Sequence, residues 1–329
     1  MAFNPRVPVI LGAAFFGEGV GSRIHTEQEA QAFIDVLPEG GLVAIDTSRH
    51  YGQGTSEEML GRLNLRGSQV DTKIYPEKPG DHKLERLHSL FQRSLEALHG
   101  VSIRIFYLHA PDRSVPFKET LRAVDELYRK GHFKEFGLSN FWAWEVAEVV
   151  GICEANGWIK PTVYQGCYNA IDRAVETELL PCLKKFGIRF FAYSPLASGF
   201  LAGTQIVGQQ AQAGVSGTAL ITNCHMENTC RTNICTAVPL SSKFTKLLCA
   251  SHDLRLSELA FRWIQHHSAL GPENAIVIGG SRPQHIKQAL LDWSSSLFCS
   301  TQGPLPDTVV RVIESAWAEL KGNVGIYAI

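Results

Sequence analysis

The sequence predicts an α/β barrel of eight strands, the (β/α)8 or TIM-barrel class, from three observations. Apolar periodicity gives strand-like and helix-like segments in strict alternation, which is typical of parallel β/α units. The strand-like segments are continuously apolar, as expected for a sheet buried on both faces. The chain has 329 residues, of which 45% are hydrophobic, and α/β barrels of this size occur as one domain, here residues 1–329.

The expected elements follow one another along the chain and complete eight strands. Their core positions are read from apolar spacing of three and four residues in helices and from short apolar runs in strands. We expect strands at 9–13, 42–46, 70–74, 103–108, 133–138, 162–165, 190–193 and 275–278. We expect helices after Thr26 and at 55–65, 84–98, 116–130, 142–156, 175–186, 257–267, 283–291 and 307–320.

Cap and turn residues support several of these helix ends. Thr26 followed by Glu29 is a capping-box pattern, and the sequence from Thr55 to Glu58 repeats it. Glycines follow the helices expected at 84–98 and 116–130, where they favour termination.

The segment 204–238 does not fit the alternation of strands and helices. It is rich in Gln, Gly, Thr, Asn and Cys, has no apolar periodicity, and contains a single basic residue, Arg231. A stretch of this length is either a functional loop or an irregular insertion, and both readings stay open. We expect an irregular insertion after the seventh strand.

Composition and charge exclude several classes of partner. Lys and Arg number 31 against 32 Asp and Glu, so no net field attracts nucleic acid or an anionic membrane. No apolar run is long enough to span a membrane. Eight cysteines without a C-x-x-C pair argue for a reducing, cytoplasmic location. Cys224, His225, Cys230 and Cys235 match no common zinc spacing, so no metal is expected.

Four ionisable residues, Asp46, Tyr51, Lys73 and His109, follow or end strand-like segments in the first third of the chain. An α/β barrel keeps its chemistry at that edge. An ammonium beside a phenol favours the phenolate, so Lys73 would turn Tyr51 into a proton donor, with Asp46 orienting Lys73. His109 could donate a hydrogen bond to a carbonyl oxygen. The set suits hydride addition to an aldehyde or ketone, although a plain Lys73–Asp46 salt bridge is the structural alternative.

Short motifs recur in order along nearly the whole chain. They are Asp46-Thr with Tyr51-Gly52, Thr72-Lys73, Tyr107-Leu-His109, Gly137-Leu-Ser139-Asn140, Tyr164-Gln165, Ala192-Tyr193-Ser194-Pro195-Leu196 and Ile278-Gly279-Gly280-Ser281. Together they resemble the aldo-keto reductase family. Tyr168-Asn169-Ala170 and Arg262-Trp263-Ile264 are similar to its aflatoxin-aldehyde reductase branch, including fungal members.

The resemblance implies a role for each matching position. Asp46, Tyr51, Lys73 and His109 fall on the catalytic tetrad of the family, with Tyr51 as general acid. The resemblance also implies that NADPH or NADP binds here. The implied contacts are Ser139, Asn140 and Gln165 to the carboxamide, Tyr193 with Ser194 and Leu196 at the nicotinamide, Gly279, Ser281 and Arg282 at the 2′-phosphate, and Gln288 near the adenine.

The function implied by the resemblance is reduction of a small-molecule aldehyde or ketone, in secondary metabolism or aldehyde detoxification. Oxidation of an alcohol by the same residues is the reverse possibility. A cofactor-binding regulatory subunit, or a barrel inactivated by the 204–238 segment, are the alternatives from other classes. A homodimer is compatible with the sequence.

Three residues near the expected site have two readings each. Trp142 could line the substrate pocket or be buried through its apolar ring. Asp112 and Arg113 could contact substrate or cap the turn that follows His109.

Overall fold

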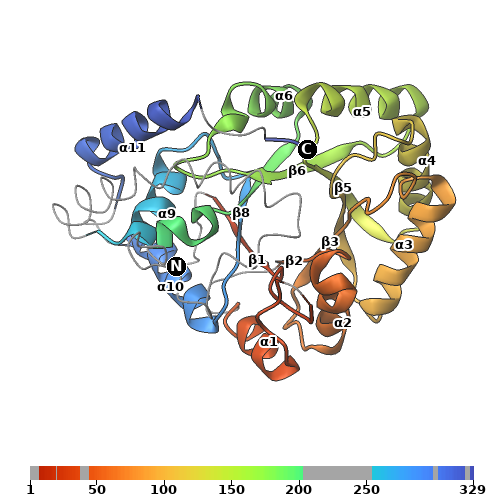
Figure 1. Cartoon of the computed structure of the whole chain (residues 1–329), viewed down its shortest axis with the longest axis horizontal. Helices are drawn as coiled ribbons and strands as arrows, with labels where there is room; N and C mark the ends of the chain where they lie inside the picture. Colours follow the sequence, from red (N-terminus) through yellow and green to blue (C-terminus); the bar gives the residue numbers. More distant parts are fainter. Residues whose placement is uncertain (1–6, 20, 38–43, 203–253, 299–302, 323–326) are drawn as a thin grey trace.

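The computed structural model describes residues 7–19, 21–37, 44–202, 254–298, 303–322 and 327–329. Eight parallel strands close into a barrel in which each strand pairs with the next and β1 pairs with β8. Helices surround the strands (Figure 1). The strands are β1 (Val9–Gly12), β2 (Ala44–Asp46), β3 (Gln69–Ile74), β4 (Ile103–Leu108), β5 (Phe133–Ser139), β6 (Pro161–Cys167), β7 (Arg189–Tyr193) and β8 (Ala275–Ile278).

This topology confirms the predicted fold class. Strands that follow one another in sequence are neighbours in the barrel, and the first and last strands, β1 and β8, pair to close it. The expected insertion at 204–238 lies outside the described residues, and the assignment of the whole chain to one domain stays a prediction.

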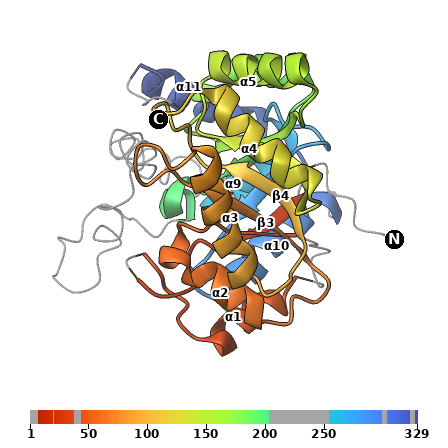
Figure 2. The same ribbon diagram turned by 90° about the vertical axis from the view of Figure 1, so that its right-hand side faces the viewer.

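The helices lie where the apolar spacing places them, with three differences. The helix expected at 55–65 ends at Arg62. Residues 175–186 form two pieces rather than one, and the helix expected to end at 291 continues to 298. Figure 2 shows α3 and α4 side by side on the outside of the barrel. The α-helices are α1 (Glu27–Ile34), α2 (Thr55–Arg62), α3 (Leu84–Ala97), α4 (Phe117–Arg129), α5 (Ala143–Asn156), α6 (Leu179–Phe186), α9 (Leu256–His266), α10 (Pro283–Phe298) and α11 (Asp307–Leu320); the 3-10 helices are η2 (Tyr51–Gly54), η3 (Ala174–Glu176) and η4 (Ala197–Ala202).

The two predicted capping boxes have different outcomes. Thr26 caps α1 as expected, since its hydroxyl accepts from the Glu29 amide and the Glu29 carboxylate accepts from the Thr26 amide. The box from Thr55 to Glu58 is wrong. Gly54, with φ of 101°, is the N-cap of α2, and the Thr55 hydroxyl donates to the carbonyl of Gly52 at 2.6 Å. The left-handed glycine places the N-cap one residue earlier than the pattern predicts, and the Thr55 hydroxyl contacts the preceding turn instead of capping the helix.

Apolar side chains of the described strands pack together inside the barrel. An inner apolar cluster lies inside the strands and is separate from the larger core between strands and helices. This packing confines any reaction site to an end of the barrel, and the chemistry of such barrels lies at the carboxyl ends of the strands. The inner cluster comprises Ile10, Ala44, Ile105, Tyr107, Val163, Phe191, Ala275 and Val277.

Candidate active site

The four predicted catalytic residues come together at the carboxyl end of the barrel. Asp46 ends β2, Lys73 is the penultimate residue of β3, and His109 directly follows β4. Tyr51 begins η2, the turn that continues from β2. Three neighbouring strands and one turn therefore bring together side chains that are up to 63 residues apart in sequence (109 minus 46).

Lys73 is fully buried and makes an ion pair with Asp46. Its Nζ donates to Asp46 Oδ2 at 2.6 Å and to the carbonyl of Thr47 at 2.8 Å. The other carboxylate oxygen of Asp46 accepts from Gln165 Nε2 at 2.8 Å. The ring centre of Tyr51 lies 5.0 Å from Nζ. The buried ammonium is thus held by oxygen acceptors and has the phenol ring as a close neighbour.

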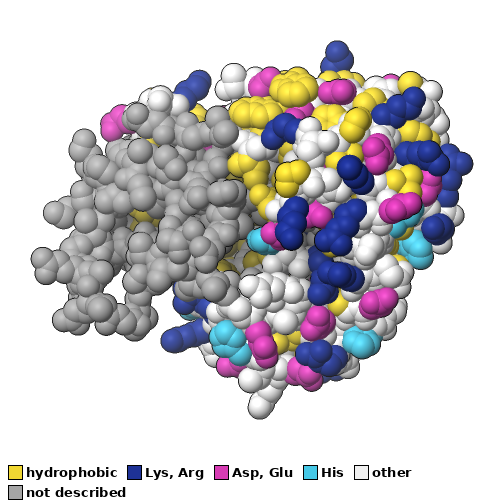
Figure 3. Space-filling model, turned by 45° about the vertical axis from the view of Figure 1, so that its right-hand side comes forward, with side chains coloured by type: hydrophobic (Ala, Val, Ile, Leu, Met, Phe, Trp, Pro, Cys, Tyr) yellow, Lys and Arg dark blue, Asp and Glu magenta, His cyan; other side chains and the backbone are white. Residues whose placement is uncertain are grey.

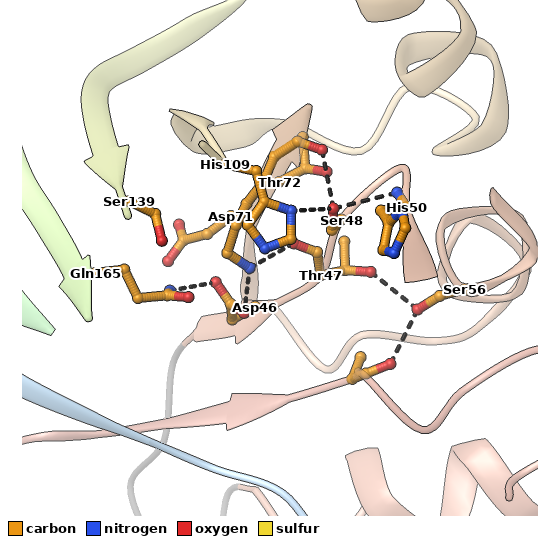
Figure 4. A network of polar contacts seen from close by, with 12 residues as sticks. Asp46, Thr47, Ser48, His50, Ser56, Asp71, Thr72, His109, Ser139 and Gln165 are labelled. Atoms are coloured by element: carbon orange, nitrogen blue, oxygen red, sulfur yellow. Dashed lines mark hydrogen bonds and ion pairs between the residues drawn. The ribbon is translucent and has the colours of Figure 1, made fainter. Parts of the chain in front are cut away.

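His109 is neutral in this site. Burial, followed by the nearby charges of Lys73 and His50, holds the pKa of its imidazole well below the ordinary value. Its ring lies 5.7 Å from the Tyr51 ring, centre to centre, and the two planes are nearly perpendicular at 85°. Its Nδ1 lies 3.0 Å from the hydroxyl oxygen of Ser48 (Figure 4). A neutral imidazole carries one proton, so one ring nitrogen is a donor and the other an acceptor.

Ser139, Asn140 and Gln165 continue the site along β5 and β6. Ser139 pairs with Gln165 in the barrel register, and all three side chains are buried. Asn140 Nδ2 donates to the carbonyl of His109 at 2.8 Å and to the hydroxyl of Ser139 at 3.0 Å. Asn140 has a φ of 61°, an uncommon conformation for a residue other than glycine. These predicted cofactor contacts therefore adjoin the four catalytic candidates directly.

The next group of predicted cofactor contacts follows β7. Tyr193, half-buried, ends the strand and packs against the inner apolar cluster. Ser194 has a φ of 55°, and its carbonyl accepts from Asn169 Nδ2 at 3.1 Å. Leu196 is half-buried against the outer core. The chain thus makes a second left-handed turn at a strand end, as it does after β5.

The remaining predicted contacts lie between β8 and α10. Gly279 directly follows β8, and the exposed Arg282 directly precedes α10. The hydroxyl of Ser281 lies 3.4 Å from His285 Nδ1. Gln288 lies inside α10 and donates to Asp292 at 2.9 Å, so its amide serves a contact within the helix. Gly279, Ser281 and Arg282 lie at the helix N-terminus, whereas Gln288 lies beyond the first turn.

Asp112 has a structural role that the sequence left open. Its carboxylate accepts from the amides of Gly80 and His82, at 2.9 and 3.1 Å, and from Ser114. Asp112 therefore caps the turn after His109, which was one of its two readings.

Arg113 and Trp142 have interactions within the chain as well. Arg113 makes an ion pair with the fully buried Glu145 and donates to the carbonyl of Ile329 at 2.7 Å. Trp142 precedes α5, and its ring centre lies 5.1 Å from that of Tyr327. These contacts join the start of α5 to the residues at 327–329.

The sequence reading missed Ser48, which contacts His109 and the backbone of β3. A serine two residues past a strand end is a weak signal in sequence, because its target lies two strands away.

Within the described ranges, no group of three or more His, Cys, Asp or Glu side chains could hold a metal. Cys224, His225, Cys230 and Cys235, at which no metal was expected, lie outside those ranges. No described helix is long and apolar enough to cross a membrane.

Comparison with known proteins gives consistent matches. The sequence model of the Aldo/keto reductase family matches residues 8–297. An aldo-keto reductase of Pseudocercospora fijiensis is 39% identical over 307 residues, which cover 89% of this chain and 99% of the relative. Aflatoxin B1 aldehyde reductase member 2 of Rattus norvegicus is 37% identical and covers 91% of this chain and 82% of its own. Aldo-keto reductase pigE of Monascus ruber is 33% identical and covers 98% and 97%.

These matches confirm the predicted resemblance, including its aflatoxin-aldehyde and fungal relatives. Amide and hydroxyl side chains at the ends of β5 and β6 suit the carboxamide of a nicotinamide in hydrogen-bonding chemistry, and they adjoin Lys73 and His109. The barrel, the site and the family match together identify the chain as a member of the aldo/keto reductase family, an oxidoreductase that acts on carbonyl groups with a nicotinamide cofactor.

Proposed function

We propose that this protein reduces an aldehyde or ketone to an alcohol with NADPH, and that Tyr51 is the general acid. The observation that carries the proposal is the surroundings of Lys73. Its ammonium is fully buried, is held by Asp46 at 2.6 Å, and lies 5.0 Å from the Tyr51 ring centre. A buried cation beside a phenol stabilises the phenolate that remains after proton donation.

Each residue of the set has a part in this reaction. A nicotinamide cofactor, when bound, would supply the hydride to the carbonyl carbon. Tyr51 gives its phenolic proton to the substrate oxygen, and Lys73 stabilises the resulting phenolate. Asp46 keeps the ammonium charged and oriented, while Gln165 holds the second carboxylate oxygen of Asp46. His109, neutral because of its lowered pKa, donates a hydrogen bond to the same substrate oxygen.

The preference for NADPH is part of the proposal. Arg282 is exposed beside Ser281 at the N-terminus of α10, a helix of 16 residues. An arginine and a hydroxyl at a helix N-terminus favour an anion, here the 2′-phosphate that NADPH has and NADH lacks. Ser139, Asn140 and Gln165 would hold the carboxamide, and Tyr193 would stack on the nicotinamide, with Ser194 and Leu196 beside it. Gln288 would lie near the adenine.

The relatives suggest the substrate class. One is named for an aldehyde of aflatoxin B1, and another, pigE, is an aldo-keto reductase of a fungus. We propose a small-molecule carbonyl substrate, in aldehyde detoxification or in secondary metabolism, and a cytoplasmic location.

The test compares Tyr51→Phe with wild type in NADPH oxidation over a panel of aldehydes and ketones. Loss of a general acid should lower kcat by roughly 10²- to 10⁴-fold. NADPH should still raise the melting temperature of the variant, and should raise it more than NADH does. Wild-type kcat in the Tyr51→Phe variant would contradict the assignment of Tyr51.

Tyr107→Phe is the matched control. Tyr107 is fully buried, its ring centre lies 5.9 Å from Lys73 Nζ, and its hydroxyl has no hydrogen-bond partner among the described residues. Removal of this hydroxyl tests whether the loss of any phenol near Lys73 lowers kcat, or only the loss of the Tyr51 phenol. We expect the control to keep kcat within about threefold, since no hydrogen bond is lost.

A further inference from the structure

The hydroxyl of Ser48 lies between His109 and two backbone segments. Its Oγ is 3.0 Å from His109 Nδ1 and 3.1 Å from the carbonyl oxygen of Lys73. It also accepts a hydrogen bond from the amide of His50 at 3.2 Å. Ser48 is fully buried, so water does not compete for these contacts. Figure 4 shows Ser48 between the rings of His109 and His50.

The single proton of the Ser48 hydroxyl has two acceptors within reach. It can point to His109 Nδ1 or to the carbonyl of Lys73. The carbonyl of Lys73 already accepts from the amide of Arg49 at 3.0 Å. Among the described residues, Ser48 is the single hydrogen-bond partner of His109 Nδ1. The amide of His50 donates to one lone pair of the hydroxyl oxygen, a bond that does not use the Ser48 proton, so this proton can be donated to Nδ1.

The protonation of His109 decides what this contact does. Its imidazole is neutral, with Lys73 and His50 as the charged or ionisable groups that act on it and with the rings of Tyr51 and Tyr75 packed against it. A carbonyl substrate has no proton to donate. His109 can therefore orient such a substrate only if Nε2 carries the ring proton and Nδ1 is the acceptor.

We propose that Ser48 is a positioning residue which donates its proton to His109 Nδ1 and so fixes the Nε2–H tautomer that faces the substrate. This inference rests on the proposed function for the role of His109, and it adds a residue that acts through His109. The Ser48 contact also fixes the rotation of the imidazole ring, because Nδ1 is anchored to the turn that follows β2.

The direct test is ¹⁵N NMR of protein labelled at its histidines, whose two ring nitrogens have distinct shifts in each tautomer. The His109 signals are assigned by their loss in His109→Gln. Wild type should show a proton on Nε2 and an unprotonated, hydrogen-bonded Nδ1. Ser48→Ala leaves Nδ1 without a donor, so a measurable share of His109 should move its proton to Nδ1. Ser48→Thr keeps a hydroxyl and should restore the wild-type spectrum.

Ser56→Ala is the matched control. Ser56 is another fully buried serine close by, but its hydroxyl contacts Thr47 at 2.9 Å and the carbonyl of Ala13 at 3.0 Å. It should leave the His109 tautomer unchanged while losing a comparable number of hydrogen bonds. A wild-type spectrum with the proton on Nδ1 would overturn the proposal, as would a Ser48→Ala spectrum identical to wild type.

Kinetics separate this proposal from the proposed function. Ser48→Ala should lower kcat/KM for carbonyl reduction about tenfold, the scale of one hydrogen bond, without changing the melting shift caused by NADPH. Ser48→Thr should recover the rate. If no variant and no wild type reduced a carbonyl, the proposed function would fail while the tautomer result would still stand or fall on the spectra.

Discussion

Two ion pairs inside the barrel share strand β3 and differ in almost everything else. Lys73, near the carboxyl end, binds Asp46, and Asp71, two residues earlier on the same face, binds Arg104. Asp46 and Asp71 are also register partners between β2 and β3. Lys73, Asp46 and Asp71 are all buried. Strand β3 thus carries the cation Lys73 near its carboxyl end and the anion Asp71 two residues earlier.

In the Asp71–Arg104 pair, here called the deeper pair, the charged groups bind each other. Arg104 reaches Asp71 with two of its nitrogens, one at 2.8 Å, and its guanidinium lies 5.9 Å from the ring centre of Phe191 in the inner cluster. Arginine keeps its charge and fits a carboxylate with two parallel bonds. In such a pair each charge is satisfied by the other, so removal of either partner should destabilise the fold.

In the Lys73–Asp46 pair, here called the upper pair, the ammonium has more donors than the pair uses. Lysine is a point charge with three N–H donors, and Asp46 and the Thr47 carbonyl account for two of them. The Tyr51 ring centre lies 5.0 Å from Nζ, and that of the buried Tyr107 lies 5.9 Å away. The comparison indicates that burial of an ion pair does not by itself mark a catalytic site; the neighbour that can exchange a proton does.

The largest expected effect is on Lys73. Lys73→Met removes the ammonium and keeps most of the side-chain volume, so carbonyl reduction should fall by roughly 10²- to 10⁴-fold. Steady-state NADPH oxidation measures the loss, and the melting temperature with NADPH reports whether the cofactor still binds. Activity within tenfold of wild type would make the upper pair structural and remove the contrast with the deeper one.

Arg104→Met tests the deeper pair and should act on stability instead. It leaves the Asp71 carboxylate buried without its partner, which costs about 3–5 kcal/mol of unfolding free energy in comparable buried pairs. Urea unfolding at neutral pH measures this cost. The kcat of the folded variant should stay within a few-fold of wild type. A large loss of kcat with unchanged stability would mean that the deeper pair serves the reaction and not the stability of the fold, contrary to the comparison.

The sequence sufficed to predict the barrel and the proximity of Asp46, Tyr51, Lys73 and His109, because strand ends in a parallel barrel meet at one edge. The catalytic roles of these four residues stay a proposal. It did not predict the Asp71–Arg104 pair. Arg104 lies next to Ile103 in β4, opposite a register shift in β3 between Val70 and Asp71, and that irregularity decides which side chains meet.

The error at the start of α2 and the omission of Ser48 have related causes. The capping pattern at Thr55 is local, but the left-handed Gly54 overrides it. Ser48 contacts His109 across β3, and the pairing of β2 and β4 with β3 brings the ends of these two strands close together. Local patterns predict elements well, whereas contacts between non-adjacent strands depend on the packing of the whole barrel.

The smallest expected effect is the pH dependence of the deeper pair. Burial raises the pKa of Asp71 from 3.8 to about 6, although Arg104 opposes the rise. Between these pH values the folded protein keeps a proton that the unfolded chain has released. Asp71 therefore adds stability below about pH 4 and loses this contribution as pH rises through about 6, at most about 3 kcal/mol. The unfolding free energy of wild type minus that of Asp71→Asn should fall from pH 4 to 6 and then level off.

Subtracting the unfolding free energy of Asp71→Asn from that of wild type removes the contributions of other groups that titrate in the same pH range. His82, whose pKa is lowered by burial to about 4, acts with the opposite sign, since its neutral form is favoured in the fold and stability rises with pH. His82 is present in both proteins, so its contribution cancels in the subtraction. Urea unfolding at pH 4, 5, 6 and 7 gives both curves. A difference that does not vary with pH would mean that Arg104 keeps Asp71 ionised from pH 4 to 7, and it would contradict the raised pKa of Asp71.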